Sequence, residues 1–155
     1  MEFSIQNVNL HNPVHRNHFI KLLNDYIKDP MGNNRPMRKE LAPKIISGLK
    51  KHARFLGFFV LADDQFAGLA NCNINFSTFQ AKPIINIHDF VVAPEFRNLG
   101  AGEYLLDAIL KYASSNGFCR VNLEVREDNL AAKSLYKKMG FSDCVPKMLF
   151  WEKKV

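Results

Sequence analysis

The chain has 155 residues, of which 47% are hydrophobic and 23% charged, so we expect one globular domain spanning residues 1–155. Its net charge of +6 is moderate, and no block of five or six like charges indicates a nucleic-acid-binding tail. The three cysteines are scattered and form no C-x-x-C pair, which argues against disulfides and a metal site and favours the cytoplasm. Neither a signal-peptide pattern nor an apolar run of membrane-spanning length occurs, so we expect a soluble protein without a membrane partner.

Hydrophobic periodicity divides the chain into short elements. Alternating apolar and polar residues indicate strands, whereas apolar residues three and four positions apart indicate helices. Asn12-Pro13 predicts the start of the first helix, and Gly117 and Gly140 predict the ends of the last two. In chain order, the expected elements are a strand over 2–8, helices over 13–28 and 37–52, strands over 55–62, 66–76 and 84–92, a helix over 102–116, a strand over 121–125, a helix over 130–139, and short strands over 141–144 and 147–152.

The resulting order is β-α-α-β-β-β-α-β-α-β-β. Hairpins in the middle of the chain give way to strands that alternate with helices. This order predicts an α/β (α+β) fold in which about four helices cover the two faces of a mixed sheet of about six to seven strands.

Two polar features of the first half bear on function. Residues 29–36 are rich in turn formers, and they form either a bare connection or a loop over a substrate site. Asn71, Asn73 and Asn75 share one strand face, and Phe66 and Ala70 are expected to share the other. We interpret the asparagine face as solvated rather than ligand-binding.

The pattern Arg97-x-x-Gly100-x-Gly102 lies between an apolar strand and an amphipathic helix. Two glycines at a helix start leave backbone N–H groups uncovered, and the helix dipole adds partial positive charge there. Such a turn binds a diphosphate well, although it can also be a plain helix-capping turn. It is not a Walker loop, which would end in Gly-Lys-Ser/Thr, nor a dinucleotide fingerprint, which needs a third glycine.

This loop resembles the acetyl-CoA pyrophosphate loop, R/Q-x-x-G-x-G/A, of the Gcn5-related N-acetyltransferase (GNAT) superfamily. The later Asn129-x-x-Ala132-x-x-x-Tyr136-x-x-x-Gly140-Phe141 is similar to that superfamily's N-x-x-A-x-x-x-Y-x-x-x-G-F. The run from Ile87 to Arg97 and the order of helices and strands also resemble theirs. The first eighty residues match in outline.

The resemblance implies acetyl transfer from acetyl-CoA to a primary amine by direct attack in a ternary complex. It implies that Tyr136 is the acid for the CoA thiolate, and that the N–H of Val91 or Val92 polarises the thioester carbonyl. From the residues alone, Arg97 can also be a surface arginine, Tyr136 a core aromatic and Asn129 an N-cap. The implied cofactor contacts are Phe90, Val91, Val92, Arg97, Asn98, Leu99, Gly100, Ala101, Gly102, Asn129 and Tyr136.

The base that deprotonates the amine is open between Asp89, His88 and a water chain. The two residues lie where the family often carries an acidic pair, and an imidazole suits a base at neutral pH. As neighbours on a strand they point to opposite faces unless a bulge intervenes, so one of them at most is expected to face the substrate. We favour Asp89, because a carboxylate can also hold the incoming ammonium, while a structural role is the alternative for each.

The acceptor implied by the resemblance is a small amine or an exposed protein amine. The stretch 76–83 resembles a hairpin of the diamine and thialysine acetyltransferases, which favours small amines, although a net charge of +6 is unexpected for a polyamine site. The resemblance also implies a homodimer. Two alternatives stay open: a non-catalytic acyl-CoA-binding module of the same fold, and a nucleic-acid or partner-binding protein whose glycine loop is structural.

Overall fold

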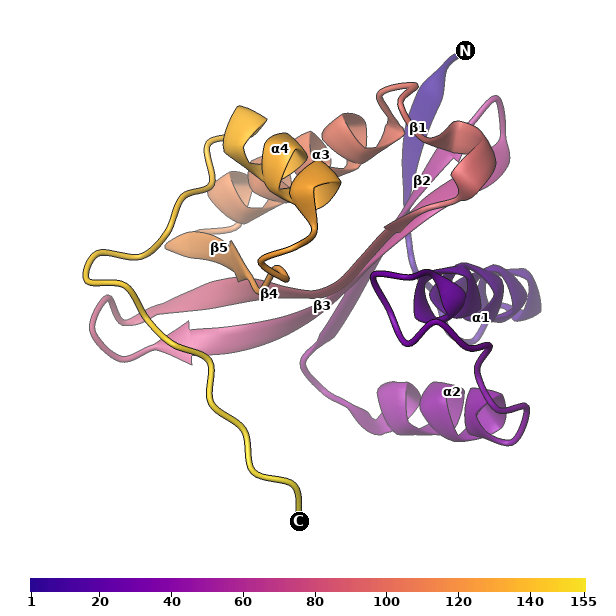
Figure 1. Cartoon of the computed structure of the whole chain (residues 1–155), viewed down its shortest axis with the longest axis horizontal. Helices are drawn as coiled ribbons and strands as arrows, with labels where there is room; N and C mark the ends of the chain where they lie inside the picture. Colours follow the sequence, from indigo (N-terminus) through magenta and orange to yellow (C-terminus); the bar gives the residue numbers. More distant parts are fainter.

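The computed structural model describes residues 1–155, and it has the expected order of helices and strands up to the last helix. Figure 1 shows a twisted sheet that lies between two layers of helices. The elements are β1 (Phe3–Asn7), α1 (Pro13–Lys28), α2 (Leu41–Lys51), β2 (Phe55–Ala62), β3 (Gln65–Ser77), β4 (Lys82–Val92), the 3-10 helix η1 (Pro94–Phe96), α3 (Ala101–Ser115), β5 (Arg120–Leu123) and α4 (Leu130–Lys138).

The sheet has five strands in the order β1-β2-β3-β4-β5. The first four strands pair antiparallel, whereas β4 and β5 are parallel because α3 crosses over between them. α3 and α4 cover one face of the sheet, and α1 and α2 cover the other (Figure 1). The predicted α/β class with a mixed sheet is therefore confirmed.

Two hydrophobic cores hold these layers together, one on each face of the sheet. In β2, Phe58 and Val60 belong to the core under α3, and Phe59 and Leu61 belong to the core under α1. Because both faces of β2 are covered, its sequence is apolar at successive positions instead of alternating.

A bulge between β2 and β3 changes the face on which one side chain lies. The register shifts between Val60 and Leu61, which leaves Ala67 as an extra residue on β3. Phe66 therefore packs in the core under α1, while Ala70 packs in the core under α3. The expectation that these two residues share a face is wrong, since period-two counting fails across a bulge.

The short strands expected over 141–144 and 147–152 do not form, so the sheet has five strands instead of six or seven. Residues 148–151 are apolar at successive positions, and they are between 71% and 84% exposed. A run without alternation needs cover on both faces of a sheet. The edge strand β5 takes part in the core under α3 and contributes nothing to the core under α1, so a strand beside β5 would lack a second layer.

Candidate active site

A cleft opens where β4 and β5 diverge. Their parallel pairing runs from Ile84 with Arg120 to Ile87 with Leu123, and beyond that point β4 continues while β5 ends. The cleft has a volume of about 610 Å³ and is lined by β4, by the start of α3, by α4 and by the end of α1. It lies at the carboxyl ends of neighbouring parallel strands, where ligands of α/β sheets commonly bind.

Most residues that the motifs single out line this cleft. Three do not: Ala101 is buried, Leu99 is 48% exposed, and Asp89 faces α1 as described below. The predicted residues that the structure brings together in the cleft are His88, Phe90, Val91, Val92, Arg97, Asn98, Gly100, Gly102, Asn129 and Tyr136.

The loop before α3 leaves the first backbone N–H groups of that helix uncovered. Asn98 and Gly100 adopt left-handed conformations, with φ of 61° and 94°, and they turn the chain sharply into the helix. No side chain caps α3, and the first intrahelical bond runs from the Tyr104 N–H to the Gly100 carbonyl. The N–H groups of residues 101–103 are therefore available to an anion.

Gly102 has a packing role in the same turn. A Cβ at this position would lie 3.1 Å from the Leu135 side chain and 3.4 Å from the Val92 side chain. The absence of a side chain thus allows α3 to approach α4 and β4 closely, which narrows the end of the cleft.

Arg97 is held by two groups and does not project freely from the surface. Its Nε donates to the Val92 carbonyl at 3.1 Å, and its Nη2 lies 2.9 Å from Oδ2 of Asp29. A hydrogen bond from the Met31 N–H and, against the effect of burial, one from Arg97 keep the pKa of Asp29 below its ordinary value. Asp29 therefore stays ionised at neutral pH and pairs with Arg97.

The main chain of Val92 points into the cleft. The Ala93 N–H donates to Ala67 of β3 at 2.8 Å, and successive main-chain groups of a strand point to opposite edges. Val92 consequently directs its polar main-chain groups away from β3, and its carbonyl accepts from Arg97 on that side. Of the two predicted donors, Val91 and Val92, this geometry favours the N–H of Val92.

The N-cap and one face of α4 bring Asn129 and Tyr136 to the cleft. The Asn129 side chain accepts from the Ala132 N–H at 3.1 Å, so the predicted N-cap is confirmed. Tyr136 is 9% exposed and packs edge-on against Phe90, with ring centroids 6.0 Å apart. Burial, with a smaller effect from Tyr26, raises the pKa of Tyr136 to about 12, so its hydroxyl is a proton donor at neutral pH.

A second bulge, on β4, separates the two predicted bases. Asn71 pairs with Asp89 and Cys72 pairs with Ile87, so His88 is the extra residue. His88 is exposed and lines the cleft. Asp89 turns toward α1 instead, where its Oδ2 accepts from Asn71 Nδ2 at 2.7 Å.

This contact also corrects the interpretation of the asparagine row as a solvated face. Asn71 is 7% exposed and carries a buried Oδ1 that has no partner, and Asn73 lies 3.0 Å from His52 Nε2. Asn75 alone of the three is exposed. Asn71 is thus a buried hydrogen-bonding residue, whereas Asn73 makes its contact with His52 at the surface.

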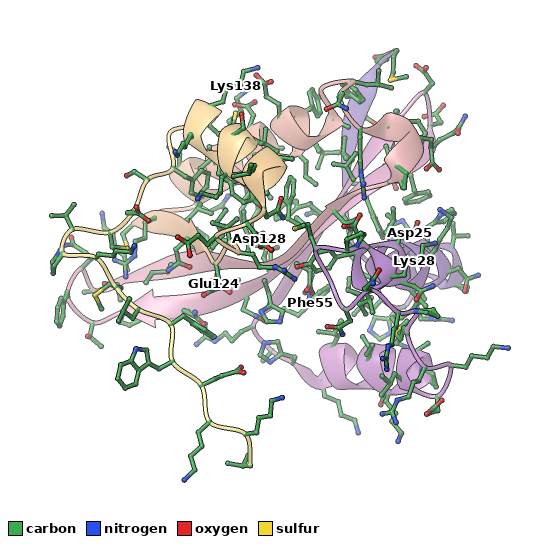
Figure 2. The ribbon with its side chains drawn as sticks, viewed as in Figure 1. Asp25, Lys28, Phe55, Glu124, Asp128 and Lys138 are labelled. Atoms are coloured by element: carbon green, nitrogen blue, oxygen red, sulfur yellow. The ribbon has the colours of Figure 1, made fainter.

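Glu124 is a cleft residue that the motifs do not include. Because Ile87 and Leu123 pair in register, His88 and Glu124 are the next residues on either side of the divergence. Figure 2 shows Glu124 just beyond the end of β5. Asn86 Nδ2 lies 3.5 Å from Glu124 Oε1, so the carboxylate is partly oriented. The parallel register is the signal that identifies it, and the linear sequence does not reveal that register.

The connection after α1 completes the cleft. Tyr26, Asp29 and Met31 line it, so residues 29–36 are more than a bare connection. Arg126 Nη1 reaches the Met31 carbonyl at 3.4 Å, which joins this connection to the loop between β5 and α4. The first and last thirds of the chain thus meet across the cleft.

The acetyltransferase (GNAT) family model matches residues 20–141, and the chain belongs to this family. The superfamily predicted from the two motifs is therefore confirmed. The match covers both the glycine loop before α3 and helix α4, which are the segments that carry the motifs.

Sequence similarity to relatives with known names extends over part of the chain. An uncharacterised N-acetyltransferase of Methanocaldococcus jannaschii is 33% identical over 89 residues, which is 56% of this chain and 39% of that protein. The ribosomal protein bS18-alanine N-acetyltransferase of Salmonella typhimurium is 31% identical over 90 residues, which is 58% of this chain and 57% of that protein. The matched stretches thus span from about two-fifths to three-fifths of the length of these relatives.

Solved structures share the whole fold. An aminoglycoside acetyltransferase from an uncultured soil sample, in complex with sisomicin, has a TM-score of 0.79 at 14% identity over 99% of this chain and 96% of that one. The acetyltransferase AAC(6')-Iy, in complex with a bisubstrate analog, has a TM-score of 0.76 at 16% identity over 100% of both chains. At these identities the likeness shows the fold.

Proposed function

We propose that the chain is an acetyl-CoA-dependent N-acetyltransferase that acts on a primary amine by direct attack in a ternary complex. The observation that carries this proposal is the cleft at the β4–β5 divergence, which gathers an uncapped helix start, outward-facing main-chain groups and a buried tyrosine around one space. The N-acetyltransferases among the relatives support it. The three elements match the needs of acyl transfer from a thioester.

The cofactor would bind along the wall formed by β4, the glycine loop and α4. The N–H groups of residues 101–103 would hold its diphosphate, and Leu99 and Ala101 would contribute through the main chain alone. The outward main-chain groups of Phe90 and Val92 would pair with the pantetheine arm, as a peptide adds to an open strand edge. Val91 would contribute as a neighbour on the same strand. The N–H of Val92 would then polarise the thioester carbonyl.

Tyr136 would supply the proton that the leaving thiolate takes up. Its pKa of about 12 keeps the phenol protonated, and its position beside Phe90 sets it next to the strand that would carry the thioester. As the amine nitrogen bonds to the acetyl carbon and the carbon–sulfur bond breaks, the phenol proton would pass to sulfur. The alternative role, a core aromatic that only packs, does not require Tyr136 to line the cleft, whereas the role of proton donor does.

Glu124 is the group that we propose accepts the proton of the amine, directly or through water. It faces the cleft as a carboxylate, and His88 lies across the divergence as a second proton carrier. Asp89 stays a candidate as well, but its carboxylate faces Asn71 and α1. A carboxylate at the cleft wall would also attract the ammonium form of the acceptor.

We further propose a small cationic amine as the acceptor, in line with the diamine and thialysine resemblance. Aminoglycoside acetyltransferases share the fold, and the Salmonella relative is named for an alanine of a ribosomal protein. Glu124 suits a cationic acceptor of either kind. Diamines, aminoglycosides and peptides with a free N-terminus therefore form the panel to be tested.

The test is thiol release from acetyl-CoA by the full chain in the presence of each amine. We expect release that depends on one class of amine, together with a product heavier by one acetyl group in mass spectrometry. Binding of acetyl-CoA without turnover on any amine would favour an acyl-CoA-binding module instead. If acetyl-CoA does not bind at all, both the N-acetyltransferase and the acyl-CoA-binding module are excluded.

The homodimer and the cytoplasmic location also stay proposals. Five large apolar side chains at positions 145 and 148–151 are at least 71% exposed, which is the observation that favours association of two chains. None of the helices combines the length and the apolar character of a membrane span. Sedimentation over a range of concentrations tests the dimer, since a dissociating pair changes its apparent mass on dilution.

A further inference from the structure

One ion pair ties the connection after α1 to the cofactor loop. Arg97 Nη2 lies 2.9 Å from Oδ2 of Asp29, which is 68 residues earlier in the chain. The side chains of Arg97 and Asp29 are 43% and 20% exposed, so this pair is partly exposed to water. In the chain without cofactor, the arginine of the diphosphate loop is therefore neutralised by a carboxylate from the opposite wall.

Asp29 also organises the segment that follows it. Its Oδ1 accepts from the Met31 N–H at 2.9 Å, and its carbonyl accepts from the N–H groups of Gly32 and Asn34 at 2.8 and 3.2 Å. A Cβ on Gly32 would lie 2.3 Å from the Tyr26 carbonyl, so the turn is packed closely against the end of α1. Residues 29–34 therefore form a compact turn, which the Asn33 N–H also ties to the Ile27 carbonyl at 2.7 Å. On the cleft side, Arg97 holds this turn through Asp29 and Arg126 holds it through the Met31 carbonyl.

We propose that Asp29 and the cofactor diphosphate compete for Arg97, so that cofactor binding releases the 29–34 turn and opens the acceptor side of the cleft. This inference rests on the function proposed above. Asp29 is then a positioning residue, which links the two ligands without touching the reacting atoms.

The charges at the site favour replacement of Asp29 by the diphosphate as the partner of Arg97. A guanidinium offers five donors in one plane, and Arg97 uses Nε for Val92 and Nη2 for Asp29. A diphosphate carries more negative charge than a carboxylate and also gains the N–H groups at the start of α3. Once it binds, Asp29 faces a like charge and loses its partner, whereas its bond from the Met31 N–H keeps the turn itself intact.

The first test is Asp29→Asn, which removes the charge and keeps an oxygen for the Met31 N–H. We expect acetyl-CoA to bind about two- to fivefold more tightly, the size expected for a partly exposed ion pair. KM for the acceptor at saturating acetyl-CoA should stay unchanged, because the turn is then released in both chains. General damage to the fold would weaken both ligands. Equal or weaker binding of acetyl-CoA by a folded Asp29→Asn chain would overturn the inference.

Two further variants isolate the pair. In an Arg97→Gln background, the gain in acetyl-CoA affinity from Asn at position 29 should shrink, because no ion pair remains to be broken and only the repulsion between Asp29 and the diphosphate is relieved. An undiminished gain in that background would overturn the competition for Arg97. Glu40→Gln is the matched control, since Glu40 also pairs with an arginine, Arg38 at 3.6 Å, in the same connection but outside the cleft. Glu40→Gln should change neither the affinity for acetyl-CoA nor KM for the acceptor. An effect equal to that of Asp29→Asn would show that the loss of one negative charge anywhere in the chain is enough to tighten binding.

Hydrogen exchange on the wild-type chain supplies a readout without any variant. We expect coenzyme A to speed exchange in residues 29–36 while it slows exchange at the start of α3. Slower exchange in both segments would overturn the inference and leave the proposed function standing. If coenzyme A binds nowhere, the proposed function and this inference both fail.

Discussion

The two walls of the cleft are built in different ways. The wall that we propose for the cofactor, called the cofactor wall, is formed by β4, the glycine loop and α4. Its shape follows from local backbone features such as the positive φ of Gly100 and the Asn129 cap. The acceptor wall is assembled from the end of α1, the bulge at His88 and the residues after β5. Its shape follows from side-chain contacts between distant segments, such as that of Arg97 with Asp29.

This difference predicts which ligand each change will affect. Backbone changes in the cofactor wall should alter affinity for acetyl-CoA, whereas changes of charge in the acceptor wall should alter the use of the amine. Tyr136 stands between the walls, and its loss should act on the chemical step itself.

Tyr136→Phe should give the largest effect, a fall in kcat of about 100-fold with acetyl-CoA affinity unchanged within about twofold. The hydroxyl is needed when charge develops on sulfur and not while the thioester is intact. Because the pKa of Tyr136 is raised to about 12, above its ordinary value, the wild-type rate should show no fall due to this group at moderately alkaline pH. Steady-state kinetics and calorimetry check the two quantities, and wild-type turnover would make Tyr136 a packing residue.

Glu124→Gln should lower kcat/KM for the amine by about tenfold to 100-fold at pH 7, with little change in acetyl-CoA affinity. The loss should shrink as pH rises, because solvent then deprotonates more of the amine. Asp89→Asn and His88→Gln are the comparison variants in the same pH series. A larger loss from Asp89→Asn would indicate that Asp89, and not Glu124, is the base.

Gly100→Asp should weaken acetyl-CoA by about 30-fold, or about 2 kcal/mol, since it sets a carboxylate beside the diphosphate. Gly100→Asn is the matched control, because asparagine tolerates the φ of 94° and brings no charge. Calorimetric titration of both folded variants measures the effect. Equal affinities would show that the start of α3 is not where the diphosphate binds.

The contrast between the walls also explains which parts of the molecule could be predicted. Helix caps, glycine turns and the motif through Tyr136 are local, so they indicated the order of elements, the family and most of the cofactor wall. The faces taken by Phe66 and His88 depend on bulges, and the place of Glu124 depends on a parallel register, which no local pattern encodes. The strands expected after α4 failed because an apolar run predicts a strand without showing what would cover it.

Gly48→Ala should give the smallest effect and serves as a baseline outside both walls. A Cβ at this position in α2 meets nothing within 4 Å, and alanine favours a helix over glycine. We expect the free energy of unfolding to rise by about 0.5–1 kcal/mol with both ligands unaffected. Urea unfolding checks this value, and a changed affinity for either ligand would show that the walls are coupled to α2.

The central claim is that acetyl-CoA binds where β4 and β5 diverge, and amide chemical shifts during a titration of the full chain with acetyl-CoA test it most directly. The account predicts that the N–H signals of Val92, Ala101, Gly102 and Glu103 move the furthest and saturate together, because these are the groups that would bind the thioester carbonyl and the diphosphate. Signals from α2 should stay in place. Saturable shifts centred elsewhere on the chain, or no shifts in these four amides, would contradict the account.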